Sequence, residues 1–460
     1  MESRHRRALA AGAATVASAL ALTVQAAASP PQPAPSGKGP LPAGAHTHGS
    51  GSAHNRRSNG AECPPGLACD VAPAAYAQNS ADPGDYGNYD LANRPADGLG
   101  IRFVVVHDTE EGYDPTIAEF QDPLAYVSAH YVVRSSDGAV TQMVPTADVA
   151  WQAGNWWINT HSVGIENEGY ALNGSQWFTN RLYHSLARLT RYQAERFGIP
   201  LDREHIIGHD QVPGPTTPYQ AGMHWDPGPY FDWAHFMALV GAPITPRGGD
   251  PTGRIVTIDP NFATNDQLVT GCDAGLCAPS GPQPSNFVYL HTAPSADSPL
   301  VADPLLAAAG TEPDGTGTTL AWDWGDKAVT GQTFAVADRR GDWVAVWYGG
   351  QEAWLYDPQG SGSSTIPGNG TLVTPRPGLA SIPVYGRAYP SSVSTDTLGY
   401  TIPAGQEYVA KDLVGADYYS ASTFNAPSTY SVQRSAEQFY EISFNHRIAF
   451  VRASDVAVVQ

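Results

Sequence analysis

The pattern of hydrophobic residues separates a region with both helix and strand periodicity from a longer region with strand periodicity alone. Within residues 63–243, a largely apolar and β-branched run at 101–107 predicts a strand that is buried on both faces of a sheet. Leucines recur at helical spacing over 182–189, and Gly198 followed by Pro200 predicts where that helix ends. This part of the chain is therefore expected to be an α/β domain.

Beyond residue 243 the helical spacing disappears. Gly and Pro turns separate short β-rich runs as far as residue 460, as small antiparallel barrels require. Three β-rich runs within 331–356 return in a similar order within 405–452, which indicates an internal repeat. We expect two small all-β modules of one type, at 250–360 and 361–460.

The first residues have the pattern of an export signal. Basic residues precede an Ala-rich apolar run at 8–24, and small residues follow it up to Ala28, which predicts a signal peptide over 1–28. A membrane anchor is the alternative, but Ala, Gly and Thr make this run only weakly apolar. Residues 29–61 are rich in Pro, Gly and Ser without periodicity and predict a flexible linker. We expect a secreted, extracellular protein.

Length and charge narrow the class of protein. With 460 residues, of which 42% are hydrophobic, the chain is too long for one core and too apolar for disorder. A formal net charge of −19 argues against nucleic acid or an anionic membrane as the partner, because both attract Lys and Arg. We expect a monomer that has no membrane span and binds no nucleic acid.

The four cysteines form two close pairs, Cys63 with Cys69 and Cys272 with Cys277. Five and four residues separate the members of these pairs, whereas a zinc site with four thiolates usually has two residues between paired cysteines. Because export makes disulfides available, we expect the disulfides Cys63–Cys69 and Cys272–Cys277 as local loop closures. Sequence alone does not determine this connectivity.

Histidine is concentrated in the α/β region, where eight of the fourteen histidines lie between residues 100 and 240. His107 ends the buried strand, His209 ends a short strand predicted at 204–208, and Asp226 lies on a loop rich in Pro and Gly. Open α/β sheets bind ligands at the carboxyl ends of their strands. Two imidazoles and one carboxylate form a catalytic zinc set with one open position. Taken singly, each residue also fits a capping, solvated or turn position.

Several ordered segments in residues 63–243 resemble the catalytic domain of zinc-dependent N-acetylmuramoyl-L-alanine amidases, the family that includes phage lysozyme-type amidases and animal peptidoglycan recognition proteins. The matching segments are 103–109, 127–134, 150–154, 162–166, 207–209 and 226–233. The resemblance implies an amidase domain over 62–245, with a central mixed β-sheet flanked by helices. It also implies one zinc ion per chain. The ligands and catalytic residues that it implies are His107, His209 and Asp226 for the metal, Glu166 as acid/base, and His224 as a cationic or imidazole helper.

Three positions leave alternatives open. Glu166 and Glu168 point to the same face of an extended strand, so only the family resemblance favours Glu166. Relatives often carry His at the position of Gln152, and because this residue is not a ligand, we expect changed substrate contacts rather than loss of metal. Relatives often carry Lys in place of His224, whose charge depends on pH near neutrality.

The resemblance implies hydrolysis of the amide bond between N-acetylmuramic acid and L-alanine of peptidoglycan. Tyr131, Trp151, Asn155 and Trp156 are candidates to line a groove for sugar and peptide, but packing in the core or at its rim explains each of them equally well. A non-catalytic peptidoglycan-binding protein is the alternative function. The complete set of metal ligands together with the acid/base residue favours an enzyme.

The C-terminal modules resemble, more loosely, the bacterial SH3-like modules that hold enzymes on the cell wall. This resemblance rests on the segments 287–295 and 341–348. Exposed aromatic side chains there are candidates for binding wall polymer, although strand alternation turns half of them inwards. These candidates are Trp343, Trp347, Tyr348 and Trp354. Such modules would raise the local substrate concentration without new catalytic contacts.

Overall fold

A computed structural model of the chain describes residues 60–246, 253–273, 276–360 and 362–459. The predicted signal peptide at 1–28, and all of the predicted linker at 29–61 except its last two residues, lie outside these ranges. In the part of the chain that is described, no helix has the length and apolar character needed to cross a membrane.

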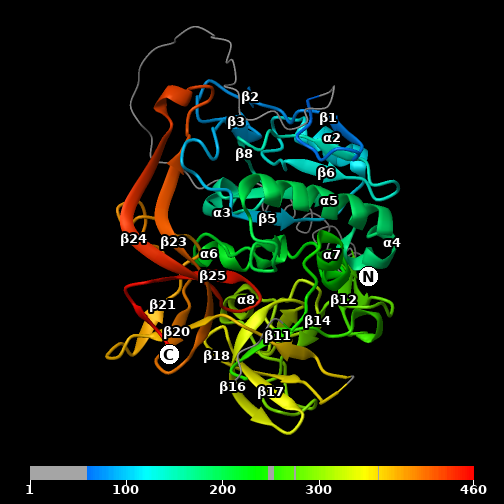
Figure 1. Cartoon of the computed structure of the whole chain (residues 1–460), viewed down its shortest axis with the longest axis vertical. Helices are drawn as coiled ribbons and strands as arrows, with labels where there is room; N and C mark the ends of the chain where they lie inside the picture. Colours follow the sequence, from blue (N-terminus) through cyan, green and yellow to red (C-terminus); the bar gives the residue numbers. More distant parts are fainter. Residues whose placement is uncertain (1–59, 247–252, 274–275, 361, 460) are drawn as a thin grey trace, which may run out of the picture. The chain divides into compact units, whose positions relative to one another are not determined.

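The α/β region is built around a six-stranded mixed sheet (Figure 1). Its strands follow the order β1 (Cys69–Val71), β7 (Val140–Gln142), β6 (Tyr131–Val133), β9 (Ser162–Asn167), β5 (Phe103–Val106) and β10 (Ile206–Gly208). Strand β5 runs parallel to both β9 and β10, whereas β6 and β7 form an antiparallel pair. The predicted mixed sheet is therefore confirmed.

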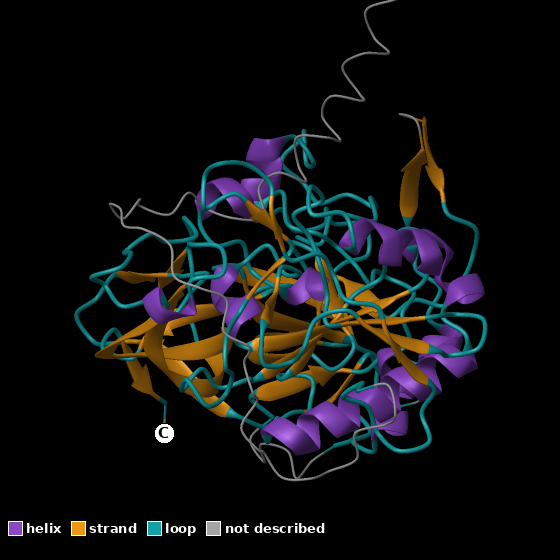
Figure 2. Ribbon diagram, turned by 90° about the horizontal axis from the view of Figure 1, so that it is seen from above, coloured by secondary structure: helices purple, strands orange, loops and turns teal. Residues whose placement is uncertain are grey.

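Side chains of β5 alternate between two hydrophobic clusters, as the pleat of a strand requires. Val104 and Val106 pack in a cluster with helices α5 (Asn180–Phe197) and α7 (Trp233–Val240). Phe103 and Val105 pack on the other face with residues of helix α3 (Trp156–Thr160). Seen from above, most helices lie at the rim around a centre of strands (Figure 2).

Local signals decide where the long helix α5 begins and ends. The hydroxyl of Thr179 accepts a hydrogen bond from the backbone N–H of Leu182, which caps the first turn. Gly198 follows the last helical residue with a left-handed φ of 72°, a conformation that glycine adopts without steric cost. The helix end predicted from Gly198 is thus confirmed.

Smaller elements complete the α/β region. The additional helices are α2 (Tyr113–Phe120), α4 (Gly174–Trp177) and α6 (Thr217–Gln220), and short strands form two further pairs, β2 (Ala77–Gln78) with β3 (Tyr86–Gly87) and β4 (Tyr89–Asp90) with β8 (Val149–Ala150).

All four cysteines form the predicted disulfides, Cys63–Cys69 and Cys272–Cys277. The second disulfide crosslinks a hairpin of β12 (Thr270–Asp273) and β13 (Leu276–Pro279).

The C-terminal region contains one topology twice. In what we call the first β unit (255–367), a five-stranded sheet follows the order β18 (Gln351–Tyr356), β17 (Trp343–Tyr348), β16 (Thr333–Arg340), β11 (Ile255–Ile258) and β19 (Thr365–Pro367). In the second β unit (371–458), the equivalent order is β25 (Ile448–Arg452), β24 (Ser431–Ser443), β23 (Tyr408–Ser420), β20 (Thr371–Pro375) and β26 (Val456–Val458).

Each unit has one equivalent two-stranded sheet between its first strand and its central hairpin, and the first unit also contains the β12–β13 hairpin. The equivalent sheets are β14 (Phe287–Tyr289) with β15 (Lys327–Val329), and β21 (Ser381–Pro383) with β22 (Thr401–Pro403). The first unit also contains a short helix, α8 (Pro304–Ala309). This shared order of strands confirms the internal repeat that the sequence indicates. Strand β19 belongs to the first sheet although it lies beyond the division expected at 360/361.

The second β unit differs from the first in the length of its central hairpin. Strands β23 and β24 have 13 residues each, against eight in β16 and six in β17. The long hairpin extends along the α/β region as far as β2 and β3 (Figure 1). There the indole of Trp157 donates a hydrogen bond to Asp417 at 3.1 Å, and the hydroxyl of Tyr86 donates one to the carbonyl of Ala421 at 2.7 Å.

The second β unit also shares a hydrophobic core with the α/β region. Tyr385, Phe439 and Phe450 of this unit belong to the same buried cluster as Phe103 and Val105 of the central sheet. One face of strand β5 is therefore covered by helices and the other partly by the second β unit. This unit is a structural part of the α/β region rather than a separate module joined to it only by the chain.

Candidate metal centre

Three polar side chains lie in a row at the carboxyl ends of adjacent parallel strands. The pairing of β5 with β9 and with β10 extends to the residues just before His107, Glu166 and His209. Neighbouring positions of parallel strands direct their side chains to the same side of the sheet. The rings of His107 and His209 accordingly lie with their centroids 4.5 Å apart, and Nδ1 of His107 lies 3.9 Å from Oε1 of Glu166.

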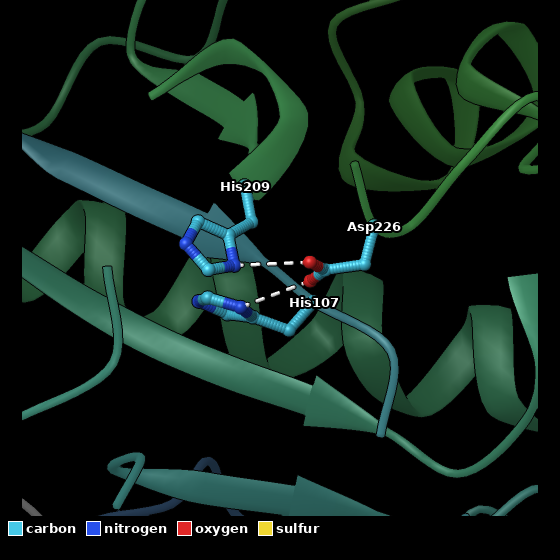
Figure 3. A group of neighbouring side chains, drawn as sticks. All are labelled: His107, His209 and Asp226. Atoms are coloured by element: carbon cyan, nitrogen blue, oxygen red, sulfur yellow. Dashed lines mark hydrogen bonds and ion pairs between the residues drawn. The ribbon is translucent and has the colours of Figure 1, made fainter. Parts of the chain in front are cut away.

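Asp226 joins this row from the loop that precedes α7. The backbone carbonyl of Asp226 accepts a hydrogen bond from the N–H of Asp210 at 2.7 Å, which holds the loop beside the end of β10. Its Oδ2 lies 3.1 Å from Nδ1 of His107, and its Oδ1 lies 3.0 Å from Nδ1 of His209 (Figure 3). One donor atom from each of these three residues lies within 4.8 Å of the others, an arrangement that could hold a metal ion.

The chemistry of this donor set fits a divalent cation. All three side chains are buried, Nδ1 of His209 faces only the carboxylate of Asp226, and Nε2 of His209 has no hydrogen-bond partner. Burial by itself would raise the pKa of Asp226, but the two imidazoles outweigh it and hold this pKa well below its usual range. Burial also lowers the pKa of His209, which favours the neutral ring. An anionic carboxylate and a neutral imidazole with a free lone pair are the forms that bind metals.

Gln152 contacts the ring nitrogen of His107 that does not face Asp226, and this contact orients the ring. Its side-chain oxygen is the hydrogen-bond partner of Nε2 of His107, and its amide nitrogen donates to the hydroxyl of Ser162 at 2.7 Å. An imidazole that donates from Nε2 carries its lone pair on Nδ1, the atom that faces Asp226. Gln152 is buried, and its contact with His107, a candidate metal ligand, is direct; its expected effect on substrate contacts stays a prediction.

Comparison with known proteins identifies the family. The family model described as N-acetylmuramoyl-L-alanine amidase matches residues 97–229, a range that contains the whole row and Asp226. N-acetylmuramoyl-L-alanine amidase A of Achromobacter lyticus is 32% identical over 186 residues, which cover 37% of this chain and 95% of that protein. The chain belongs to the N-acetylmuramoyl-L-alanine amidase family. This membership places it among hydrolases of peptidoglycan.

Two further proteins show how far the similarity extends. The 1,6-anhydro-N-acetylmuramyl-L-alanine amidase AmpD of Escherichia coli strain K12 is 35% identical to this chain over 141 residues. These residues cover 29% of this chain and 69% of AmpD. Among solved structures, the Staphylococcus aureus hydrolase AmiA in complex with its ligand has 18% sequence identity and a TM-score of 0.28. That match covers 39% of this chain and 82% of AmiA. The family model itself ends within the α/β region of the amidase, at residue 229.

The two neighbouring glutamates of the amidase have different surroundings. Glu168 accepts hydrogen bonds from the backbone N–H groups of Tyr113 at 3.1 Å and Ser135 at 2.8 Å, so its two oxygens join the start of α2 to the turn after β6. Glu166 faces the candidate metal ligand His107, and its Oε2 has no hydrogen-bond partner. Burial and the nearby Asp226 carboxylate raise the pKa of Glu166 well above its usual range. These contacts favour Glu166 as the acid/base group.

His224 lies at the open side of the ligand cluster. Its ring is centred 4.9 Å from that of His209, and its Nδ1 lies 3.7 Å from Oδ1 of Asp226. Its side chain is 58% exposed, in contrast to the buried ligands. His224 is therefore the imidazole of this cluster that a substrate can reach from solvent.

The four aromatic and amide residues considered for substrate binding are occupied by contacts within the amidase. Tyr131 is completely buried, and its hydroxyl donates to the carbonyl of Glu62 at 2.7 Å. Asn155 is also completely buried and caps α3. The indoles of Trp151 and Trp156 donate hydrogen bonds at 2.7 Å to Asp90 and 2.8 Å to the carbonyl of Tyr419. The contacts of these four residues fit packing in the core or at its rim, which was the alternative to a role in lining a substrate groove.

Proposed function

We propose that this chain is a secreted, zinc-dependent N-acetylmuramoyl-L-alanine amidase. It hydrolyses the amide bond that joins N-acetylmuramic acid to L-alanine in peptidoglycan. The observation that carries this proposal is the convergence of His107, His209 and Asp226, with Glu166 beside them on the neighbouring strand. Two imidazoles, one carboxylate and an adjacent acid/base carboxyl are the components of a hydrolytic zinc site with one open coordination position.

Zinc is the metal that best fits these ligands. Neutral imidazole and carboxylate suit Zn²⁺, whereas Ca²⁺ and Mg²⁺ prefer sites made of oxygen ligands alone. A bound zinc ion supplies Lewis-acid polarisation and lowers the pKa of water towards about 7. In this proposal His107, His209 and Asp226 hold one ion per chain, and the hydrogen bond from His107 to Gln152 holds the first ring in its ligating tautomer.

Two residues beside the ligands supply the other chemical steps, Glu166 for proton transfer and His224 for stabilisation of negative charge. Oε2 of Glu166 is free to accept the proton of the attacking water and to return it to the L-alanine nitrogen as the amide bond breaks. The exposed ring of His224 donates a hydrogen bond to the oxygen on which negative charge develops, a contribution of about 3 kcal/mol per donor in comparable sites. Burial of Glu166 favours proton transfer because its carboxyl has a raised pKa.

The wider proposal includes the location of the protein and its attachment to the wall. Two disulfides are typical of proteins that leave the reducing cytosol. In the first β unit, Trp343 is half-buried and Tyr356 is 52% exposed, with their ring centroids 5.5 Å apart. We assign wall binding to this pair, whereas Tyr348 and Trp354 are buried and point inwards. A monomer that is held on peptidoglycan in this way meets its substrate at high local concentration.

The test is a digest of purified peptidoglycan with mass analysis of the products. Stem peptides with a free L-alanine amino terminus, released together with intact glycan strands, are the expected products. New reducing sugar ends would contradict amide hydrolysis, because they require cleavage of a glycosidic bond. Binding of peptidoglycan without any released product, by protein loaded with zinc, would favour the non-catalytic recognition protein instead.

A further inference from the structure

The two β units differ at one turn, and the longer turn packs against the segments that carry His209 and Asp226. In the first unit, β17 and β18 are joined by Gly349 and Gly350 alone. In the second unit, the equivalent strands β24 and β25 are joined by four residues, 444–447. Within this turn, Asn445, His446 and Arg447 are all buried. The first unit thus shows that this fold closes the turn with two residues, so the longer turn is not needed to join the strands.

Arg447 contacts both segments that carry metal ligands downstream of β10. One guanidinium nitrogen donates to the carbonyls of Val212 at 2.6 Å and His209 at 3.4 Å. The other donates to the carbonyls of His224 at 2.9 Å and Met223 at 3.3 Å. A single side chain therefore joins the ligand His209 to the segment that leads into the ligand Asp226.

A second contact comes from the same turn. Nε2 of His446 lies 3.0 Å from Oδ2 of Asp210, the residue that follows His209, and Nδ1 of His446 lies 3.1 Å from the carbonyl of Lys327. The guanidinium carbon of Arg447 lies 4.0 Å from the ring centroid of Trp324 in the first β unit. The turn is thus held by the α/β region and by the first β unit, which leaves its polar atoms little freedom to move.

These contacts matter because three of the four hydrogen bonds, those to His209, Val212 and Met223, are buried. A buried carbonyl that loses its donor is left without a hydrogen bond, which is unfavourable, and the segment that carries it moves to recover a partner. Burial lowers the pKa of Arg447 to about 10, so the guanidinium is still charged at neutral pH. The planar guanidinium of Arg447 donates to two segments at once and so fixes the distance between them. A lysine has a single ammonium group and cannot hold both segments in the same way.

We propose that Arg447 is a positioning residue for the metal centre. In this view the second β unit supports the metal centre: its β24–β25 turn holds His209 and Asp226 at the separation that the metal requires. The zinc part of this inference rests on the proposed function, whereas the support of the two segments can be measured in the metal-free protein.

The test compares full-length Arg447→Met and Arg447→Lys with a matched control, Arg452→Met. Arg452 lies on β25 and contacts Ser391 and Glu437, away from the ligand segments. Zinc affinity is measured by competition with a chromophoric chelator, and hydrogen exchange is followed in peptides that span 209–226 of the metal-free proteins. Loss of a group that supports metal ligands weakens metal binding about 10–100-fold. We expect this loss and faster exchange at 209–226 in Arg447→Met, smaller effects in Arg447→Lys, and neither effect in Arg452→Met.

Two results would overturn the inference. One is a folded Arg447→Met protein with the zinc affinity and the exchange rates of the unsubstituted chain. The other is a lower melting temperature with unchanged affinity and exchange at 209–226, which would give Arg447 a general structural role only. If Arg447→Met does not fold, Arg447→Lys decides by the same two measurements. Failure of the unsubstituted protein to bind zinc would instead count against the proposed function, and the exchange data would still test the support of the segments.

Discussion

Oε1 of Glu166 lies 3.9 Å from Nδ1 of His107, on the adjacent parallel strand. This proximity follows from the pairing of β9 with β5, which places the two residues side by side at the ends of their strands. Glu166 is close enough to act on a water molecule at the metal centre, yet it is not one of the three clustered donors.

Replacement of Glu166 should separate catalysis from metal binding. In Glu166→Gln the three ligands are intact, so zinc content should stay near one ion per chain. The group that transfers the proton is lost, and the rate of peptide release should fall by about 10²–10⁴-fold, the usual contribution of a general acid/base. Zinc analysis and a peptidoglycan digest check both points. Activity equal to that of the unsubstituted enzyme would remove Glu166 from the mechanism.

Replacement of Glu168 should affect folding rather than chemistry. Both of its oxygens accept backbone hydrogen bonds, from Tyr113 and Ser135. In Glu168→Gln one of these N–H groups faces an amide NH₂ group, so the free energy of unfolding should fall by about 2 kcal/mol. Urea denaturation measures this loss, and the rate of peptide release by the folded variant should stay within a few-fold of the original. A rate as low as that of Glu166→Gln would show that the two glutamates share the catalytic role.

Gln152 provides a matched pair of variants at one position. Gln152→Ala removes the acceptor for Nε2 of His107, and zinc affinity should fall by about 10–100-fold. Gln152→Glu retains an acceptor at this position and should bind zinc at least as well as the unsubstituted protein. Chelator competition measures both affinities. Equal affinities for the Ala and Glu variants would show that the ring of His107 is oriented without this hydrogen bond.

His205 should make the stability of the protein depend on pH. Its Nδ1 lies 2.6 Å from Asp202, and its Nε2 lies 3.3 Å from Asp412 of the second β unit. Burial by itself would lower the pKa of His205, but the two carboxylates outweigh it and raise this pKa to about 10. The folded pKa lies above the value of about 6.5 in an unfolded chain. The stabilisation is therefore complete below pH 6.5 and is lost as the pH rises towards 10.

A neighbouring carboxyl acts in the same direction. Burial raises the pKa of Glu441, which lies near His205, to about 8, so the folded state also loses stability as this group ionises. Two cations complete the charges around this site, Arg102 and Lys411. In urea denaturation, His205→Gln should be less stable than the unsubstituted protein by about 2 kcal/mol at pH 6.5, and the difference should approach zero near pH 10. A difference that does not change with pH would contradict this account.

The aromatic pair in the first β unit should contribute to wall binding but not to hydrolysis. Each aromatic contact is worth about 0.5–1.5 kcal/mol, so the double variant Trp343→Ala/Tyr356→Ala should bind sedimented peptidoglycan about 10-fold more weakly. Its hydrolysis of a soluble muropeptide should be unchanged, because the pair belongs to β17 and β18, outside the α/β region. Unaltered sedimentation would place the wall-binding surface elsewhere.

Sequence alone determined the features that depend on local pattern. The buried run that ends at His107 and the helix that ends at Gly198 follow from periodicity and from the conformational freedom of glycine. The disulfides were expected because they join cysteines only six and five positions apart, although their connectivity became certain only in the structure. The repeat of the β units was visible in three successive runs. The ligand candidates were identifiable because imidazoles and a carboxylate follow strand ends or lie on a rigid loop, which a linear pattern can show.

Tertiary structure alone decided which of those residues act together. Glu166 and Glu168 share one strand face, and only the loops around them show that Glu168 is held by backbone N–H groups. Tyr131 and Asn155 have the composition of a binding groove but are buried. Arg447 contacts carbonyls more than 220 positions earlier in the chain. Contacts of this kind arise from strand register and from the packing of one unit on another, and such long-range pairing leaves no periodic signal in the sequence.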